Sequence, residues 1–300
     1  MIEVKNISKR FDEIQAVHQV SLRIEDGCIF GLVGTNGSGK STFLRMLAGV
    51  LKADEGTISI GDTPIYENEK IKDQIFYIPE DAYFFPNSTP LQMMEYYNSI
   101  YPEFEKAWFM ELLEKFHLDG KRRIQTFSKG MKKQVSILLG LASKAKYLLC
   151  DETFDGLDPV MRQAVKSLFA DAVVNRELTP IIASHNLREL EDICDHIGVL
   201  HEGGILLSEQ LEDMKFHIHK LQCVLPNKET EQHLLHELDV IHYEKSGSLL
   251  FVTVRGTKME IMQSVDRHET IYSEVIPLSL EEIFICEMEA VGYEIKNILF

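Results

Sequence analysis

Short runs of apolar residues recur through the first two hundred positions of the chain, separated by polar or glycine-rich stretches. Four of these runs, at positions 29–33, 75–78, 147–150 and 180–183, are almost free of polar residues. Strands that are buried on both faces of a parallel sheet have this pattern. Because segments with helical spacing lie between the runs, the sequence predicts an α/β fold built on a parallel sheet.

Other segments near the two ends of this region have the shorter or alternating pattern of partly exposed strands. We expect strands at 2–5, 17–24 and 57–60. A further pair at 197–200 and 205–208 flanks a Glu-Gly-Gly turn, which predicts a hairpin that closes the region. The first domain should therefore contain these strands in addition to the four buried runs.

Helical spacing dominates the middle of this region. From about 90 to 118 the pattern becomes helical, with Leu112, Leu113 and Phe116 on one side of a helix, and residues 132–139 predict an amphipathic helix. We expect a helical insert over about residues 87–140.

Beyond position 208 the composition becomes more acidic, and no phosphate motif recurs. After a linking helix near 211–219, the pattern predicts the order β-α-β-β-α-β and then a final helix at 279–290. We therefore expect an ATP-binding domain at 1–208 and a C-terminal accessory α+β domain at 209–300. The elements of that order are expected at 221–225, 229–238, 240–243, 249–254, 258–265 and 270–276.

The residues after the first buried run carry the clearest chemistry. Strand, glycine loop and helix in this order are the context of a phosphate-binding loop, whose glycines let backbone N–H groups surround a phosphate at the helix N-terminus. Lys40 can reach the β- and γ-phosphates, Ser41 can ligate Mg²⁺, and Thr42 can donate to the α-phosphate. We expect a nucleoside triphosphate on this loop, which comprises Gly34, Thr35, Asn36, Gly37, Ser38, Gly39, Lys40, Ser41 and Thr42.

Polar side chains follow two other predicted strands. Asp151 and Glu152 end the strand at 147–150, and a carboxylate pair downstream of a phosphate loop suggests one Mg²⁺ ligand and one base for water. His185 follows the strand at 180–183. A lone histidine is more often structural, but its place at a strand end favours a role in the same site.

Phe11 and Ser128 each have two interpretations. Phe11 lies in a polar stretch between two predicted strands, where an aromatic ring either packs half-buried or stacks on a nucleobase. Ser128 precedes the amphipathic helix, and taken alone it is best explained as an N-cap.

Composition limits the classes of function. The chain has 300 residues, 45% of them hydrophobic, and a formal net charge of −16. This size suggests two domains, and this charge argues against a broad nucleic-acid-binding surface. No apolar run reaches the length of a membrane span, and the first residues lack a signal-peptide core, so we expect a cytosolic protein. Five scattered cysteines are expected as reduced core residues.

Taken together, these segments resemble the ATP-binding subunit of ABC transporters over residues 1 to about 208. The glycine loop matches the Walker A motif, and residues 148–151 look like Walker B, with Glu152 at the place of the catalytic base. Asp158 matches the D-loop and His185 the switch histidine. Phe11 occupies the place of the aromatic residue that stacks on adenine.

The resemblance implies a P-loop NTPase fold of ABC type. This fold has a RecA-like core, an antiparallel β subdomain and a helical subdomain, and here a small C-terminal α+β domain would follow. In the family, two such domains pair head to tail and bury two ATP molecules between the Walker A motif of one subunit and the signature of the other. The signature corresponds here to Ser128, Lys129, Gly130 and Met131.

The same resemblance assigns chemical roles. Ser128 and the amide of Gly130 would hold the γ-phosphate of the opposite subunit's ATP. Glu152 would polarise the attacking water, His185 would brace it against the γ-phosphate, and Lys40 would hold the phosphates. The implied ligands are ATP and Mg²⁺.

Two departures from the family pattern stand out. Glu80 replaces the usual glutamine of the Q-loop; we expect it to coordinate Mg²⁺ with Ser41 and Asp151, and the alternative is an exposed loop carboxylate. In the signature, Lys129 replaces a glycine and Met131 a glutamine. The signature variant and the segment 279–284 resemble ATPases of bacterial exporters with an ABC-2 type membrane partner. Since no reacting group is lost, we still expect hydrolysis.

The expected function is therefore that of an ATPase subunit that drives transport, with export favoured, through separate integral-membrane subunits. It would form a homodimer or a heterodimer with another ATP-binding subunit, and it would be cytoplasmic and peripheral on the cytoplasmic face of the membrane. The alternatives are a soluble ABC-type ATPase that acts on ribosomes or DNA, and an ATP-dependent regulator. A single cassette and the net charge argue against the first, and the presence of Glu152 and His185 argues against a regulator that does not hydrolyse.

Overall fold

A computed structural model of the chain describes residues 1–290. The chain divides into two compact units, at 1–208 and 209–300. The last ten residues of the expected C-terminal domain lie outside the described residues. Within the described part, no helix is both long and apolar enough to cross a lipid bilayer.

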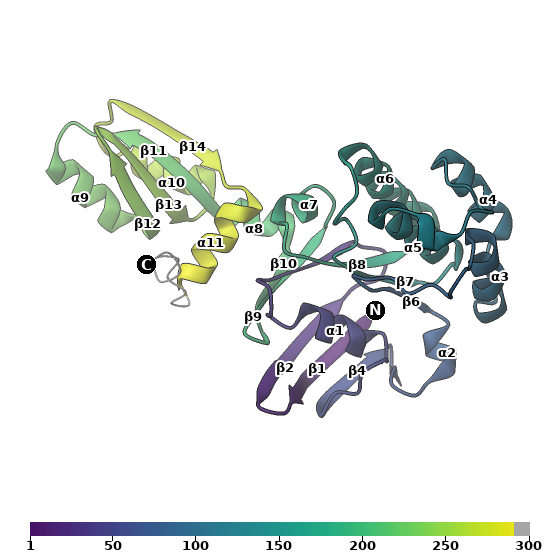
Figure 1. Ribbon diagram of the computed structural model, residues 1–300. Helices are drawn as coiled ribbons and strands as arrows, with labels where there is room; N and C mark the ends of the chain where they lie inside the picture. Colours follow the sequence, from purple (N-terminus) through teal and green to yellow (C-terminus); the bar gives the residue numbers. More distant parts are fainter. Residues whose placement is uncertain (291–300) are drawn as a thin grey trace. The chain divides into compact units, whose positions relative to one another are not determined.

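Two sheets form the first unit (Figure 1). A four-stranded sheet has the order β2-β1-β4-β5, with bounds β1 (Ile2–Phe11), β2 (Ile14–Ile24), β4 (Glu55–Ile60) and β5 (Thr63–Pro64). A six-stranded sheet has the order β10-β9-β3-β8-β7-β6, in which β9, β3, β8, β7 and β6 run parallel. Its strands are β3 (Phe30–Val33), β6 (Ile75–Ile78), β7 (Tyr147–Asp151), β8 (Thr179–Ser184), β9 (His196–His201) and β10 (Gly204–Gln210).

Helix α1 (Lys40–Leu47) lies between the two sheets, and its apolar face joins both of them into one core. Phe43, Leu44 and Leu47 are fully buried there, among side chains from β1, β2 and β3. On the other face of the six-stranded sheet lie α5 (Lys129–Ala142) and α6 (Pro159–Arg176). This layering fixes the carboxyl ends of β3, β7 and β8 at one edge, where ligands of α/β proteins bind.

The expected helical insert contains α3 (Pro90–Ile100), α4 (Lys106–Lys115) and all but the end of α5, while the short helices α2 (Glu69–Lys72) and α7 (Leu187–Glu191) lie outside it. The sequence pattern suggested continuous helical spacing from 90 to 118, but the structure has two helices. Pro102 lies between them, and the residue before a proline disfavours the helical conformation.

The four-stranded sheet differs from the sequence expectation in extent. β1 continues to Phe11, so this residue ends a strand instead of lying between strands. β4 begins at Glu55 and includes Gly56, at a register shift against β1. A Cβ at Gly56 would lie 2.3 Å from the carbonyl oxygen of Lys5, and its φ is +77°, so the bulge requires glycine.

The second unit is a four-stranded antiparallel sheet of order β12-β13-β11-β14 with helices packed on it. Leu234 of α9 and Ile261 of α10 pack with strand residues in one core. The chain order is strand, helix, strand, strand, helix, strand, flanked by α8 and α11. The bounds are α8 (Leu211–His217), β11 (Ile218–Val224), α9 (Lys228–Glu237), β12 (Asp239–Ser246), β13 (Leu249–Arg255), α10 (Lys258–Val265), β14 (Tyr272–Pro277) and α11 (Leu280–Ala290).

Candidate nucleotide site

The glycine loop connects β3 to α1, and its backbone requires glycine at several positions. Gly37 and Gly39 have φ values of +82° and +103°, in the left-handed region that glycine favours. A Cβ at Gly39 would lie 2.2 Å from the carbonyl oxygen of Ala16, and one at Gly34 would lie 2.4 Å from that of Leu200. With this tight backbone the loop leads directly into α1. At the N-terminus of that helix, free amide groups and the helix dipole favour an anion.

Lys40, the first residue of α1, folds back over this loop. Its ammonium group donates to the carbonyl oxygens of Gly34 (2.8 Å) and Thr35 (3.2 Å), and it lies 3.8 Å from Oε1 of Glu152. Burial lowers the pKa of this ammonium group, and the Glu152 carboxylate works against that shift. A cation is thus held at the phosphate loop on one side and beside the predicted base on the other.

Ser41 and Asp151 meet at the end of β7. The Ser41 hydroxyl donates to Oδ1 of Asp151 at 3.0 Å, and the Tyr77 hydroxyl donates to Oδ2 at 3.1 Å. Asp151 is only 1% exposed, yet no ammonium or guanidinium group within residues 1–290 lies at ion-pair distance from it. Burial, followed by the charge of Asp151, raises the pKa of Tyr77 to about 12, so the phenol stays a donor. A buried carboxylate beside a hydroxyl fits a hard divalent cation.

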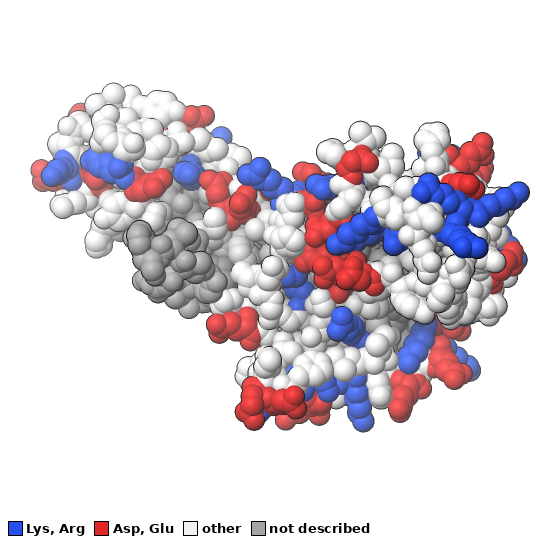
Figure 2. Space-filling view, viewed as in Figure 1, with Lys and Arg blue, Asp and Glu red and all other residues white. Residues whose placement is uncertain are grey.

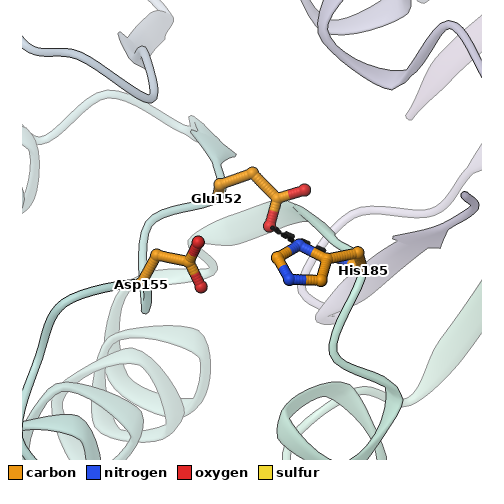
Figure 3. Close-up of side chains that lie close together, drawn as sticks. All are labelled: Glu152, Asp155 and His185. Atoms are coloured by element: carbon orange, nitrogen blue, oxygen red, sulfur yellow. Dashed lines mark hydrogen bonds and ion pairs between the residues drawn. The ribbon is translucent and has the colours of Figure 1, made fainter. Parts of the chain in front are cut away.

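Glu152 and His185 lie side by side, because β7 and β8 are neighbours in the sheet and each residue follows its strand (Figure 3). Nδ1 of His185 lies 2.9 Å from Oε2 of Glu152, and the backbone amide of His185 donates to the same oxygen at 3.4 Å. Asp155 faces this pair, and ligand atoms of all three side chains lie within 4.8 Å of one another. The Glu152 carboxylate is therefore oriented by both the ring and the backbone amide of His185.

Glu80 and Phe11 lie at the margins of the site. Glu80 is exposed in the bend after β6, and it is one of the carboxylates that oppose the burial-driven lowering of the pKa of Lys40. Phe11 is 44% exposed, with the Lys9 ammonium group 5.6 Å from the centre of its ring. The ring is thus open to a stacking partner.

The signature residues form the start of α5. The Ser128 hydroxyl accepts from the amide of Met131 at 3.2 Å, which makes it the N-cap. Ser128 and Lys129 are exposed and Gly130 is half-buried. Asp158 likewise caps α6, since its Oδ1 accepts from the amides of two residues in the first turn at 3.0 Å. Ser128 can cap the helix and still lie beside a phosphate. The first backbone amides of a helix all point out of its N-terminus, which is where an anion binds.

The structure thus brings Lys40, Ser41, Asp151, Glu152 and His185 together, as the strand ends predicted. Within the described residues, no hydrogen bond or ion pair joins them to Ser128, Asp158 or Phe11. Sequence analysis missed three polar side chains that touch or face this group. These are Tyr77, the one polar residue in its strand, Asp155, in the polar turn after Glu152, and Lys133, a buried charge in an amphipathic helix.

Comparison with known proteins agrees with this geometry. The ABC transporter family model matches residues 17–155. The chain is 32% identical to the ABC transporter ATP-binding protein YtrB of Bacillus subtilis, over 96% of this chain and 98% of the relative. It is 31% identical to the bacitracin transport ATP-binding protein BcrA of Bacillus licheniformis, over 72% of this chain and 71% of the relative.

A solved structure shows the same fold. The ATP-binding cassette MJ0796, described as a dimer in a post-hydrolysis state bound to ADP and Pi, superposes with a TM-score of 0.64. It is 23% identical to this chain, and the match covers 70% of this chain and 99% of the cassette. The fold, the phosphate loop with its carboxylates, and the similarity to YtrB over nearly the whole chain lead to one assignment: this protein is an ATPase that belongs to the ATP-binding subunits of ABC transporters.

Proposed function

We propose that two ATP-binding subunits, either two copies of this chain or this chain and a related one, close head to tail around two MgATP molecules. Hydrolysis would then drive export through separate integral-membrane subunits. The observation that carries this proposal is the completeness of one half-site. The phosphate loop, Lys40, Ser41, Asp151, Glu152 and His185 converge. Within residues 1–290, no hydrogen bond or ion pair joins Ser128 of the signature to this group, so its exposed hydroxyl can serve a second subunit.

ATP would lie along the phosphate loop. The backbone amides of residues 34–39, the Lys40 ammonium group and the Thr42 hydroxyl would hold the phosphates, and the open ring of Phe11 would stack on the adenine. Ser41, Asp151 and Glu80 would hold Mg²⁺. Bound there, Mg²⁺ would supply positive charge that offsets the negative charge developing during phosphoryl transfer.

Glu152 would act as the base in hydrolysis. A water oxygen attacks the γ-phosphorus, the bond to the bridging oxygen breaks, and ADP leaves with that oxygen while a proton passes to the Glu152 carboxylate. His185, 2.9 Å from Oε2 of Glu152, would hold the carboxylate and the water in line. Lys40 would stabilise the phosphate oxygens, since its ammonium group already lies between the loop and the base.

The signature end of α5 has the charge that the opposite ATP needs. Lys121, Arg122, Arg123 and Lys129 are exposed around Ser128, and none of them forms an ion pair within residues 1–290. Lys and Arg side chains gather over the region of α4 and α5 in Figure 2. In a chain with net charge −16, such a cluster favours an anionic partner, here the γ-phosphate held by the other subunit.

An aromatic surface beside Glu80 would receive the membrane subunit. The ring centres of Tyr83 and Phe85 are 6.2 Å apart and those of Phe85 and Tyr96 are 4.8 Å apart, and Tyr83 is 73% exposed. Tyr83 also lines a hollow of about 290 Å³, together with Pro79 and Phe84. Exposed aromatic clusters mark protein contacts, so movement of the Glu80 bend would reach the partner directly. The protein would then lie on the cytoplasmic face of the membrane.

Export is favoured by the signature variant Ser128-Lys129-Gly130-Met131. The relative named for bacitracin transport supports the coarser role in transport. The cargo would be set by the membrane subunits.

The proposal is tested with the Glu152→Gln variant. It should bind ATP, turn it over at well under a hundredth of the wild-type rate, and elute as a dimer with MgATP but as a monomer without nucleotide. Tagged protein isolated from membranes should retain an integral-membrane subunit. Wild-type turnover by the variant would exclude Glu152 as the base, and a monomer under all conditions would exclude the ATP-closed dimer.

A further inference from the structure

The peptide carbonyl of Glu152 has an unusual partner, the side chain of Lys133. The ammonium group of Lys133 donates a hydrogen bond to this carbonyl oxygen. The same oxygen also accepts from the amide of Asp155 at 3.3 Å, which closes the turn after the strand. Lys133 lies on α5, five residues after Ser128, and is only 3% exposed. A buried ammonium group from the signature helix therefore binds the backbone of the proposed base, Glu152.

The backbone of Glu152 needs such support. Its φ is +46°, in the left-handed region that a residue with a side chain adopts at a cost. Its amide donates to the carbonyl oxygen of Ala183 at 3.0 Å, so the neighbouring strand β8 fixes one side of the residue. The Lys133 hydrogen bond fixes the other side. The direction of the Glu152 carboxylate depends on this backbone conformation, because φ at Glu152 sets where its Cβ points.

A second contact shows that the start of α5 and this turn are packed as one piece. A Cβ at Gly130 would lie 2.6 Å from the carbonyl oxygen of Gly156, so the helix backbone approaches the turn directly. Gly130 and Lys133 are three residues apart and therefore lie on one face of the helix. Burial lowers the pKa of Lys133, and the nearby Asp155 carboxylate opposes this shift.

We propose that Lys133 is a positioning residue for hydrolysis: its hydrogen bond to the Glu152 carbonyl holds the carboxylate in line and ties it to the signature helix. This inference rests on the proposed role of Glu152 as the base. It predicts that loss of the Lys133 ammonium group affects the chemical step and leaves nucleotide binding unchanged, because no phosphate-binding group depends on Lys133.

The test compares Lys133→Met, Lys133→Arg and the control Lys132→Met in the full chain. Lys132 is the neighbouring cation on α5 and is half-buried, and within residues 1–290 its side chain forms no hydrogen bond with Glu152 or Asp155. Lys133→Met should lower kcat by about tenfold to a hundredfold, with the Kd of a fluorescent ATP analogue within about twofold of the wild-type value. Lys133→Arg, which keeps a donor, should recover most of kcat, and Lys132→Met should match the wild type.

The Glu152→Gln background separates positioning from general stability. If Lys133 acts through Glu152, adding Lys133→Met to Glu152→Gln should produce no further loss of the residual turnover. Wild-type kcat in Lys133→Met, a parallel loss of nucleotide affinity, or a further loss in the double variant would each overturn the proposal. Wild-type turnover in Glu152→Gln alone would instead remove the proposed base. If Lys133→Met fails to melt cooperatively, Lys133→Gln, which is too short to reach the carbonyl, carries the same expectations.

Discussion

Nδ1 of His185 lies 2.9 Å from Oε2 of Glu152, and the His185 amide reaches the same oxygen, so one residue after β8 contacts the predicted base twice. The backbone contact remains when the ring is changed. The ring alone can therefore be tested, because the carboxylate keeps an amide donor.

We expect His185→Ala to lower kcat by about a hundredfold or more, since a group that orients the water and the base contributes on that scale. The affinity for ATP should change little, because Lys40 and the phosphate loop do not depend on the ring. The measurement is steady-state turnover together with nucleotide binding by fluorescence. Equal losses of binding and turnover would instead indicate that the ring holds ATP.

The sequence pattern predicted best where the apolar positions follow an undisturbed strand or helix pattern. β6 and α10 begin and end at the expected residues 75–78 and 258–265. β1 was expected to end at position 5, but it reaches Phe11. Asn6 has a φ of +47°, and the pairing of β1 with β2 shifts register three times, so the bulges disturb the alternation by which a strand is recognised.

The sequence also predicted only part of the site. Residues that follow strand ends, such as Asp151 and His185, could be grouped from sequence because parallel strands end at one edge. Tyr77 and Lys133 could not, because their hydrogen bonds join residues that are 74 and 19 positions apart and on different elements. Only the packing of α5 and β6 against β7 brings these side chains to the carboxylates.

Glu189 gives a prediction for the pH dependence of stability. This residue of α7 is buried and pairs with Arg162 of α6, with Oε1 and Nη1 2.7 Å apart. Burial raises the pKa of its carboxyl, and Arg162 works against that shift. Because the folded-state pKa lies above the unfolded value of about 4.3, the wild type loses stability as pH rises from that value through the folded-state pKa.

Glutamine does not titrate, so Glu189→Gln lacks this loss. Urea unfolding of both proteins at about pH 4.5 and about pH 8 should show the variant gaining stability relative to the wild type at the higher pH. An offset that is the same at both pH values would mean that Glu189 ionises as easily in the folded chain as in the unfolded one.

A chain that ends at Gln210 should bind ATP on its own. It keeps β10 whole, and every residue of the proposed ATP site lies before it. MgATP should raise the melting temperature of the truncated protein and of the full-length protein by similar amounts. If truncation abolishes this stabilisation, the second unit contributes to nucleotide binding. If only the dimer of the Glu152→Gln variant is lost, the second unit supports subunit pairing.

Glu80 offers the sharpest test of the metal site, because a glutamate here adds a negative charge where the family usually has an amide. It is exposed in the bend after β6, and its charge is one of those that act on Lys40. If Glu80 coordinates Mg²⁺ directly or through one water, it should strengthen the dependence on Mg²⁺ and repel ATP that lacks the metal. Asp81, the exposed neighbour, provides a control with the same change of charge.

Glu80→Gln should therefore raise the affinity for ATP in EDTA and shift the Mg²⁺ titration of ATPase activity to higher concentration. Glu80→Ala should do the same and also slow turnover, since it removes every oxygen ligand at this position. Asp81→Asn should leave the affinity for ATP in EDTA and the Mg²⁺ titration near those of the wild type. An exposed carboxylate that does not coordinate the metal acts on it only through solvent, where salt screens the interaction. If the Mg²⁺ titrations of the Glu80 variants and the wild type coincide, Glu80 is outside the reach of the metal, and Ser41 and Asp151 remain its only proposed protein ligands.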